Sequence, residues 1–397
     1  MNKLLGFHIP HLAIKKDQSH FIKDPIYRSI HFDREQTWLY QLVDTLEFQR
    51  LHRLKQMSLN FYNFSSALHT RFTHSLGVYE LCNRFIKHFI SEGELDKEKN
   101  FKEINIALGA AILHDIGHGP LSHAFEYAIK NFEHERMGIR IITSPETKIN
   151  KLLREKSLHD GLDEDFYARE IVKVLDKSSE YKWITELISS DVDVDRMDYL
   201  VRDSYFSGVR YGNNIDVDLF IKWSTIQNGS FGFRKKIMNS LEHFALSRKH
   251  MYEDLYNNAV FRVYENLITK ICNFLVTHID HYKSKPSFQK YLFMFLMPDE
   301  NWPLEDFLDL DDERFLIFLQ SALIDGIMFD EARIYLGLLF GIWLDEKGNP
   351  ISARDIEVEK VPLDEATLVK QEKKKGDKFI KVNIWDPYNK RLTPILI

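Results

Sequence analysis

The chain has 397 residues, which exceeds the usual size of a single hydrophobic core and predicts two domains, or one large domain with an appendage. Hydrophobic residues make up 44% and charged residues 28% of the sequence, a globular composition that argues against extensive disorder. The formal net charge of −6 argues against a general polyanion-binding surface, so a nucleic-acid partner is not indicated. With only Cys82 and Cys272, the chain has too few cysteines for a disulfide framework, which fits a reducing, cytoplasmic location.

The sequence carries no recognisable targeting or membrane signal. The first twenty residues lack the apolar core and small-residue cleavage site of a signal peptide, so we expect none. No run of eighteen uncharged apolar residues is present, and we therefore expect no transmembrane span and no membrane partner. The charge-rich runs GELDKEKN (93–100) and KQEKKKGDK (370–378) are predicted to be solvated loops.

Hydrophobic periodicity divides the chain into two regions. From Thr37 to Ile279 apolar residues recur at spacings of three and four, which predicts a mainly helical core and places a first domain at residues 1–283. Residues 284–397 are predicted to form a smaller α+β domain. Within it, FLMPDENWPLEDFLDLDDERF (295–315) indicates short helices with turns, whereas IYLGLLFGIWL (334–344), FIKVNIW (379–385) and RLTPILI (391–397) are typical of strands.

The segment FKEINIALGAAILHDIGHGPLSH (101–123) carries the strongest functional signal. Apolar residues recur along it at helical spacing, and Asp115 returns to the face that begins at Ile104. A buried carboxylate is costly unless a cation or several donors compensate its charge, so a metal ion beside His114 and Asp115 is the economical explanation. The glycines and proline that follow predict a tight loop carrying His118 and His123. The alternative is an ordinary helix end whose His-Asp pair faces water.

Further histidines lie on both sides of this segment. LHTRFTHSLGVYE (68–80) places His69 and His74 on either side of Arg71, and FEHER (132–136) adds His134. One histidine at a helix start is usually structural. Three histidine-rich segments within about seventy residues are harder to explain by core packing and favour a functional site.

The segment SDVDVDRMDYLVRDSYFSGVRYG (190–212) predicts a helix with a polar face. Asp195, Tyr199 and Asp203 recur every four residues and would share that face. Over eight residues the face extends roughly 12 Å at the usual helical rise, long enough to contact a metal at one end and a nucleoside at the other. An acidic, solvent-exposed helix is the alternative interpretation.

These segments, in this order, resemble the HD superfamily of metal phosphohydrolases, and specifically its deoxynucleoside triphosphate triphosphohydrolase branch. The resemblance covers roughly residues 30–264 and rests on FQRLHRLKQ, HTRFTHSLGVYEL, ILHDIGHGPLSHAFE, FEHE and DVDVDRMDYLVRDSYFSGV. It implies a mainly α fold with a helical HD core, and hydrolysis of a deoxynucleoside triphosphate (dNTP) to the deoxynucleoside and triphosphate. The chain departs from the family pattern in NFSSALHTRF, which lacks the usual Pro-Gly or Pro-Ser pair, and in LYNNAVFRVYE, which lacks a His-Lys pair.

The resemblance also implies roles for individual residues near the phosphates. One divalent ion per subunit, with Mn, Fe, Zn, Ni and Mg as candidates, would be bound by His74, His114, Asp115 and Asp195. The group around the phosphate chain would comprise His118, His123, Glu126 and His134. Within it, Glu126 could orient the ring of His123, which makes His123 the candidate general acid.

The remaining implied roles concern the substrate. Arg71 matches a phosphate-binding arginine, whose planar guanidinium suits bidentate contact with a phosphate. Gln56, Tyr199 and Asp203 match positions that surround the deoxyribose and read its 3′-hydroxyl. Arg196, a further substrate-binding candidate, stands where relatives have Lys or Arg. Tyr252 matches an aromatic residue that lies beneath the sugar, where its ring would leave no room for a 2′-hydroxyl.

Other functions remain open at this point. A nucleoside monophosphate phosphatase, or a cyclic-nucleotide or alarmone phosphodiesterase, would use the same metal ligands with a different nucleoside pocket. A nucleotide-sensing or single-strand-binding scaffold without turnover is a third hypothesis, against which the intact set of four metal ligands argues. The expected partners are a deoxynucleotide substrate and further copies of the same chain in a homo-oligomer.

Overall fold

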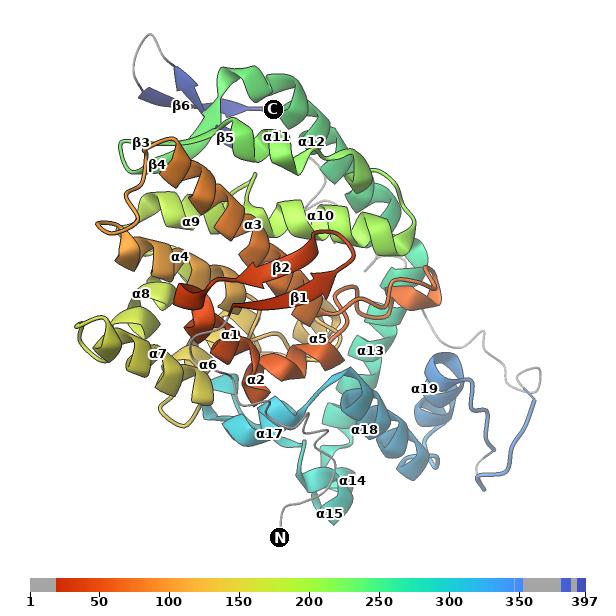
Figure 1. Cartoon of the computed structure of the whole chain (residues 1–397). Helices are drawn as coiled ribbons and strands as arrows, with labels where there is room; N and C mark the ends of the chain where they lie inside the picture. The colour runs from red at the N-terminus through yellow and green to blue at the C-terminus, as the bar shows by residue number, and fades with distance from the viewer. Residues whose placement is uncertain (1–18, 346, 353–379, 387–390) are drawn as a thin grey trace.

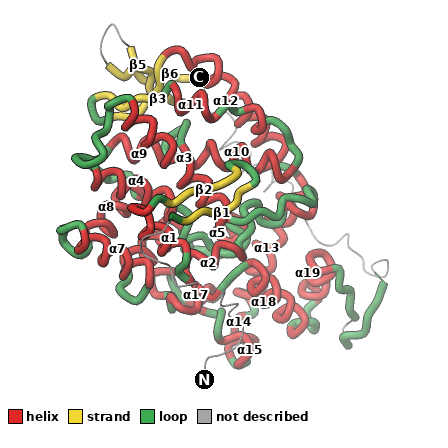
Figure 2. The backbone as a smooth tube through the Cα atoms, in the orientation of Figure 1, coloured by secondary structure: helices red, strands yellow, loops and turns green. Residues whose placement is uncertain are grey.

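The computed structural model describes residues 19–345, 347–352, 380–386 and 391–397. Helices form most of this structure, and short strands lie in two places at its surface (Figures 1 and 2). The fold prediction of a mainly α protein with a helical core and a small α+β region is therefore confirmed. Within the described part of the chain, no helix combines the length and the apolarity needed to cross a bilayer.

The α-helices are, in chain order, α1 Thr37–Val43, α2 Leu46–Gln49, α3 Arg71–Ser91, α4 Phe101–Leu113, α5 His123–Ala128, α6 His134–Thr143, α7 Lys148–His159, α8 Phe166–Leu175, α9 Lys182–Ile188, α10 Val194–Ser207, α11 Val217–Lys222, α12 Met238–Met251, α13 Ala259–Thr277, α14 Ile279–Lys283, α15 Pro286–Gln289, α16 Phe293–Leu296, α17 Leu304–Asp309, α18 Asp312–Asp325 and α19 Asp330–Phe340. The strands are β1 His20–Asp24, β2 Arg28–Phe32, β3 Ser224–Gln227, β4 Ser230–Arg234, β5 Lys381–Asp386 and β6 Arg391–Leu396. A π-helical turn, Tyr252–Tyr256, follows α12 directly.

Three helices build the part of the core that positions the site. Helix α3 packs against both α4 and α10, and most side chains of α3 and α4 are buried. The start of α10 is fixed by the Asp193 side chain, which accepts a hydrogen bond from the Arg196 N–H at 2.7 Å. Its end is fixed by Gly208 in the left-handed conformation. These helices bring residues 74, 114–115 and 195 to one place.

Two small sheets accompany the helices. Strands β1 and β2 form an antiparallel hairpin, and the second sheet has the order β3-β4-β5-β6, with β4 and β5 parallel. The C-terminal strands β5 and β6 confirm the strands predicted in FIKVNIW and RLTPILI. They join a hairpin whose own strands come from residues 224–234. The domain boundary at residue 283 stays a prediction.

Two local predictions need correction. The run 334–344 was predicted to be a strand, but it is helical up to Phe340, where Gly341 ends α19 in the left-handed conformation. A short apolar run does not distinguish a strand from a buried helix, and the acidic Asp330 and Glu331 in the first turn favour the helix. The β3–β4 hairpin was missed inside the region predicted to be helical, although Asn228-Gly229 at its turn is a strong hairpin signal.

The short helices predicted for 295–315 are confirmed, as is the loop at 93–100, while the run 370–378 lies outside the described residues.

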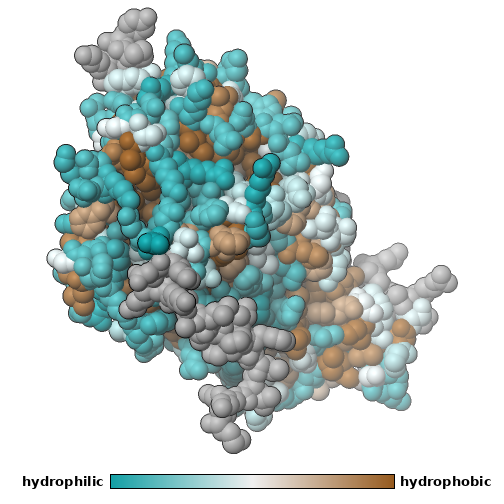
Figure 3. All heavy atoms as spheres, in the orientation of Figure 1, coloured by the Kyte–Doolittle hydropathy of each residue, from teal (hydrophilic) through white to brown (hydrophobic). Residues whose placement is uncertain are grey.

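The surface around α18 and α19 differs in polarity from the rest of the visible face. Figure 3 shows apolar side chains gathering in the region of α18 and α19, and the exposed residues there include Ile317, Ile324 and Met328. Elsewhere the visible face is mainly hydrophilic.

Candidate metal centre and active site

Four predicted metal ligands converge where α3, α4 and α10 meet. His74 lies in the first turn of α3, His114 and Asp115 directly follow α4, and Asp195 lies in the first turn of α10. The Nε2 atom of His74 lies 3.2 Å from Nε2 of His114 and 3.0 Å from Oδ1 of Asp195. The Asp115 carboxylate lies 3.5 Å from His114 Nε2 and 3.7 Å from His74 Nε2.

The second nitrogen of each imidazole determines its tautomer. His114 Nδ1 lies 2.9 Å from the Ala111 carbonyl oxygen, which can only accept, so Nδ1 donates. His74 Nδ1 donates in the same way to the Asp198 carboxylate at 2.8 Å. When both rings are neutral, their Nε2 lone pairs face each other beside two carboxylates, and a proton on His74 Nε2 would take the same position as a metal ion. Acceptors without a shared donor suit a cation, and the set of two imidazoles and two carboxylates fits a divalent metal ion.

The electrostatics also favour positive charge at this position. Burial opposes a charged ring at His74, but the hydrogen bonds with Asp195 and Asp198 raise its pKa to about 10. Burial likewise opposes a charged Asp115, yet the Arg71 guanidinium and His114 hold the pKa of that carboxyl well below its usual range. The carboxylate of Asp115 thus remains ionised and is available to bind a metal ion together with the imidazoles.

Asp198 is a contributor that sequence reasoning missed. It is completely buried on α10 and accepts hydrogen bonds from His74 and from Arg202, whose Nε lies 2.8 Å away. Arg202 in turn donates to Asp24 of β1 at 2.8 Å. Gly77 of α3 leaves the necessary room, because a Cβ atom there would lie 1.9 Å from Oδ1 of Asp198. The buried acidic residues of α10 exclude the alternative of a solvent-exposed acidic helix.

The second predicted group also comes together, next to the first. The Glu126 carboxylate accepts from Nδ1 of His123 at 2.8 Å and from both Nδ1 and the backbone N–H of His134. The His134 ring stacks on His118 at 3.9 Å, and His118 Nε2 lies 3.2 Å from Asp115. The sequence predicted that His123 lies in the loop before α5, but it is the first residue of that helix.

The ionisable side chains of this second group influence one another's pKa values. Burial opposes ionisation of Glu126, but its hydrogen bonds with His123 and His134 hold the pKa of the carboxyl far below its usual range. Burial also opposes a charged His134, whose pKa is nevertheless raised by Glu126. Burial, Arg71 and His134 lower the pKa of His118. An ionised Glu126 therefore orients two imidazoles, whereas His118 favours the neutral form.

Arg71 connects the two groups. Its guanidinium is buried, pairs with Asp115, and donates from Nε to the Ser122 hydroxyl at 2.9 Å. Arg196, by contrast, forms an ion pair with Asp193 and donates a hydrogen bond to the Ser190 carbonyl, just before α10. Arg71 is therefore the cation held directly beside the metal ligands.

The predicted deoxyribose contacts lie further along α10. Asp203 is buried and accepts from His69 Nε2 at 2.6 Å and from the Tyr256 hydroxyl at 2.7 Å. The ring centroid of Tyr256 lies 6.0 Å from that of Tyr199 and 5.1 Å from that of Tyr252. Sequence reasoning assigned Tyr252 and missed Tyr256, and it noted His69 without giving it a role.

Gln56 lies at the edge of this region. Its backbone N–H donates to the His69 carbonyl at 2.9 Å. Its side-chain oxygen Oε1 is buried and has no hydrogen-bond partner among the described residues. A buried acceptor without a donor is costly, and a bound ligand offering a hydroxyl would satisfy it.

Comparison with known proteins identifies the family. The HD domain family matches residues 71–203, the stretch that contains both groups. The uncharacterized protein YwfO of Bacillus subtilis is 33% identical over 313 residues, which cover 77% of this chain and 67% of YwfO. The chain belongs to the HD-domain phosphohydrolase superfamily, in the branch that resembles the dNTP triphosphohydrolases.

Two further proteins are similar to this HD-domain phosphohydrolase. The deoxynucleoside triphosphate triphosphohydrolase SAMHD1 of Homo sapiens is 28% identical over 298 residues, covering 67% of this chain and 46% of SAMHD1. A phosphohydrolase from Bacteroides thetaiotaomicron shares the fold, with a TM-score of 0.68, 22% identity, and coverage of 94% of this chain and 93% of that one. The chain spans about two thirds or less of the length of the curated relatives it matches.

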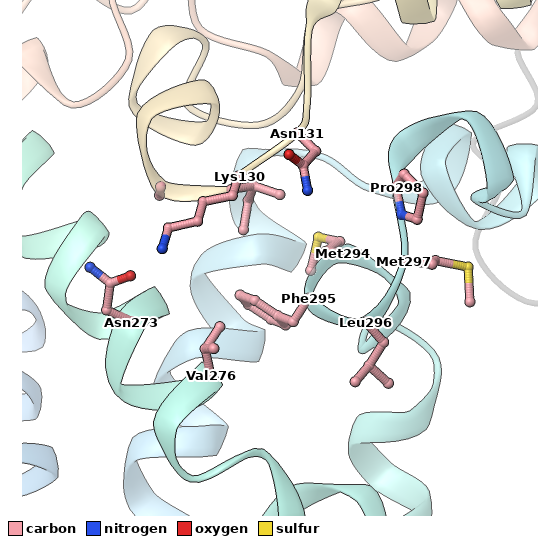
Figure 4. Close-up of a pocket in the computed structure, with 11 residues that line it drawn as sticks. Lys130, Asn131, Asn273, Val276, Met294, Phe295, Leu296, Met297 and Pro298 are labelled. Atoms are coloured by element: carbon pink, nitrogen blue, oxygen red, sulfur yellow. The ribbon is translucent and has the colours of Figure 1, made fainter.

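A cavity of this HD-domain phosphohydrolase lies away from the residues described above. It encloses about 250 Å³ between the end of α5, α13 and α16 (Figure 4). Lys130, Asn131 and Asn273 provide its polar side chains, and Val276 and Phe295 are among the apolar ones. None of the predicted site residues lines this cavity, so it is separate from the two groups described above.

Proposed function

We propose that the protein hydrolyses dNTPs to the deoxynucleoside and triphosphate in a metal-dependent reaction. The observation that carries this proposal is the polar face of α10, where Asp195 lies among the metal ligands and Asp203, two turns on, accepts two hydrogen bonds at the far end. A substrate lying along this face would have phosphates at one end and deoxyribose at the other.

The metal would be bound by His74, His114, Asp115 and Asp195. A bound divalent ion supplies Lewis-acid polarisation of a phosphoryl oxygen and lowers the pKa of water towards neutrality. Arg71, held by Asp115 and Ser122, is placed to contact the phosphates through its planar guanidinium.

The leaving group requires a proton. Water attacks the α-phosphorus, the bond from phosphorus to the 5′-oxygen breaks, and that oxygen must be protonated as it leaves. His123 donates from Nδ1 to Glu126, which orients the ring and leaves Nε2 for proton transfer. The His123 side chain is 54% exposed, in contrast to buried His118, so it is accessible to a substrate.

The sugar would be recognised at Asp203. Each carboxylate oxygen of Asp203 accepts one hydrogen bond, from His69 or from Tyr256, and retains capacity to accept another from a 3′-hydroxyl. Gln56 Oε1 offers a second acceptor for the same substrate. The rings of Tyr199, Tyr252 and Tyr256 form an aromatic wall that would exclude a 2′-hydroxyl by filling the space beside carbon 2′.

Product analysis tests this proposal. The metal-loaded protein is incubated with dATP, dGTP, ATP and dAMP in ¹⁸O-labelled water, and the products are resolved by chromatography and mass spectrometry. We expect deoxynucleoside and triphosphate from the dNTPs, with the label in the triphosphate. Release of phosphate from dAMP alone would indicate a monophosphate phosphatase, and tight dNTP binding without turnover a sensing scaffold. The homo-oligomer and the cytoplasmic location stay predictions.

A further inference from the structure

The start of α18 reaches the candidate active site from outside the matched HD segment. Asp312, the first residue of α18, is 1% exposed. Its Oδ1 accepts a hydrogen bond from the Leu121 N–H at 2.7 Å, and its Oδ2 accepts one from the Lys55 N–H at 2.8 Å. One carboxylate therefore joins two backbone segments that are distant in the sequence.

The first of these segments is a strained turn. Leu121 and Ser122 both have positive φ values, 54° and 53°, and Ser122 has ψ −122°. Such conformations are unfavourable for residues with a side chain and persist only where surrounding contacts impose them. His123 follows at once and begins α5, while the Ser122 hydroxyl accepts from Arg71. The turn therefore sets the position of both side chains proposed to act on the phosphates.

The second segment carries Gln56, directly after Lys55. The two segments also contact each other through a hydrogen bond from the Ser122 hydroxyl to the Lys55 carbonyl, which is long at 3.3 Å. Arg50 makes a second connection between these regions. Its guanidinium donates to the His118 carbonyl and to the Leu310 carbonyl, each at 2.8 Å. Leu310 and Asp312, at the junction of α17 and α18, thus contact the segments that carry Gln56 and His123.

We propose that Asp312 is a positioning residue for the phosphohydrolase reaction. It holds the turn before His123 in register with the segment that carries Gln56. This inference rests on the proposed function, which gives those two side chains their roles. Capping of α18 does not account for Asp312, since Asp311 already caps the helix by accepting from the Arg314 N–H at 2.9 Å.

The test compares Asp312→Ala and Asp312→Asn with Asp309→Ala as a matched control. Asp309 is the last residue of α17, three residues before Asp312, and its carboxylate pairs with Lys290 and Arg314. Steady-state kinetics with dATP, metal content, and peptide-level hydrogen exchange over residues 51–57 and 116–123 are measured on the full-length, metal-loaded protein. Asparagine retains one acceptor oxygen and serves as the variant with the smaller perturbation.

For Asp312→Ala we expect faster exchange in both peptides and a kcat loss of roughly 10- to 100-fold, the scale expected when a reacting group is misplaced by about 1 Å. Metal content should be unchanged, Asp312→Asn should show a smaller kcat loss, and Asp309→Ala should behave as wild type. Wild-type kcat in either Asp312 variant would overturn the inference. If wild-type protein hydrolyses no dNTP, the proposed function fails, and the exchange data alone decide whether Asp312 holds the two segments.

Discussion

At the scale of single residues, the side chains of the candidate metal group depend on hydrogen-bond and ion-pair partners that orient them. Asp198 and the Ala111 carbonyl orient the two imidazoles, and Arg71 keeps Asp115 ionised. Such outer partners commonly contribute about 10- to 100-fold to metal affinity. The ligands and these partners therefore form one unit, and a substitution in either affects binding.

Replacing Asp115 with alanine should abolish both metal retention and turnover. The carboxylate supplies negative charge beside both imidazole Nε2 atoms, and its removal also leaves Arg71 without its partner in a buried position. Elemental analysis and product release measure the two effects, and circular dichroism should show helical content close to wild type. Full metal occupancy with normal activity would remove Asp115 from the ligand set.

Replacing His123 with alanine should separate metal binding from catalysis. The side chain contacts Glu126 rather than a metal ligand, so metal content should remain at the wild-type level. Turnover should fall by roughly 10²–10⁴-fold, the usual range for loss of a general acid or base. Single-turnover kinetics with metal analysis check both statements. Near-normal rates would exclude His123 from the mechanism.

The two tyrosines near Asp203 should behave differently. Tyr256→Phe removes the hydroxyl that donates to Asp203, so we expect weaker dNTP binding by about three- to tenfold, with sugar discrimination largely retained. Tyr252→Ala should instead narrow the gap between dNTP and rNTP hydrolysis, because it opens the aromatic wall. The measurement is kcat/KM for dATP and ATP in each variant. If the ratio of kcat/KM for dATP to that for ATP is unchanged in Tyr252→Ala, Tyr199 or Tyr256 would be the residue that excludes the 2′-hydroxyl.

These residues also show how far sequence reasoning reached. The motifs predicted His74, His114 and Asp115, which lie within reach of one ion, and Asp195 beside them, because each lies in a short segment with a recognisable pattern. Asp198 and Tyr256 were missed for physical reasons. Asp198 acts through His74 rather than directly, and Tyr256 lies in a π-helical turn, where the extra residue per turn changes which side chain faces α10.

At the scale of elements, α3 and α10 approach each other closely at Gly77. A Cβ atom at this position would lie 1.9 Å from Oδ1 of Asp198 and 2.5 Å from Nη2 of Arg202. Because both atoms belong to a buried ion pair, neither can move without breaking the support of His74. The spacing of the two helices and the metal group are therefore coupled.

Gly77→Ala should accordingly weaken both stability and metal binding. We expect a loss of about 1–3 kcal/mol in the free energy of unfolding from overpacking, and about 10- to 100-fold weaker metal affinity from the displaced Asp198. Gly138→Ala on α6 is the control, since its added Cβ would lie 3.6 Å from the nearest atom, an ordinary contact. Denaturation and metal titration of both variants make the comparison. Equal behaviour of the two would contradict this coupling.

Elements were predicted well where a long periodic pattern dominates, and poorly where two short patterns compete. Helices α3, α4 and α10 each show buried residues at helical spacing over several turns. The 334–344 run, with β-favouring aromatic residues and two glycines, is helical as far as Phe340. It belongs to α19, whose acidic first turn and Gly341 end suit a helix that packs on α18. Tertiary packing thus decided what the local sequence left open.

At the scale of the whole molecule, the C-terminal strands attach to the HD core through the sheet β3-β4-β5-β6. Glu186 of α9 links the parts, because its carboxylate accepts from the Phe231 N–H of β4 at 2.8 Å and from the Asn383 side chain of β5 at 3.2 Å. This sheet is one attachment of the C-terminal region to the core, and Asp312 is another, at the site itself.

The attachment of the sheet depends on Gly232. A Cβ atom at this position of β4 would lie 2.6 Å from the Asn383 carbonyl oxygen and 2.7 Å from Leu392 Cδ2. Gly232→Ala should therefore separate β5 and β6 from β4 at a cost of about 1–3 kcal/mol, the usual range for overpacking. We expect faster hydrogen exchange in residues 381–386 and 391–396, with metal content and turnover unchanged. Ser230→Ala in the same strand is the control, and unchanged exchange in Gly232→Ala would show that β4 does not hold the C-terminal strands.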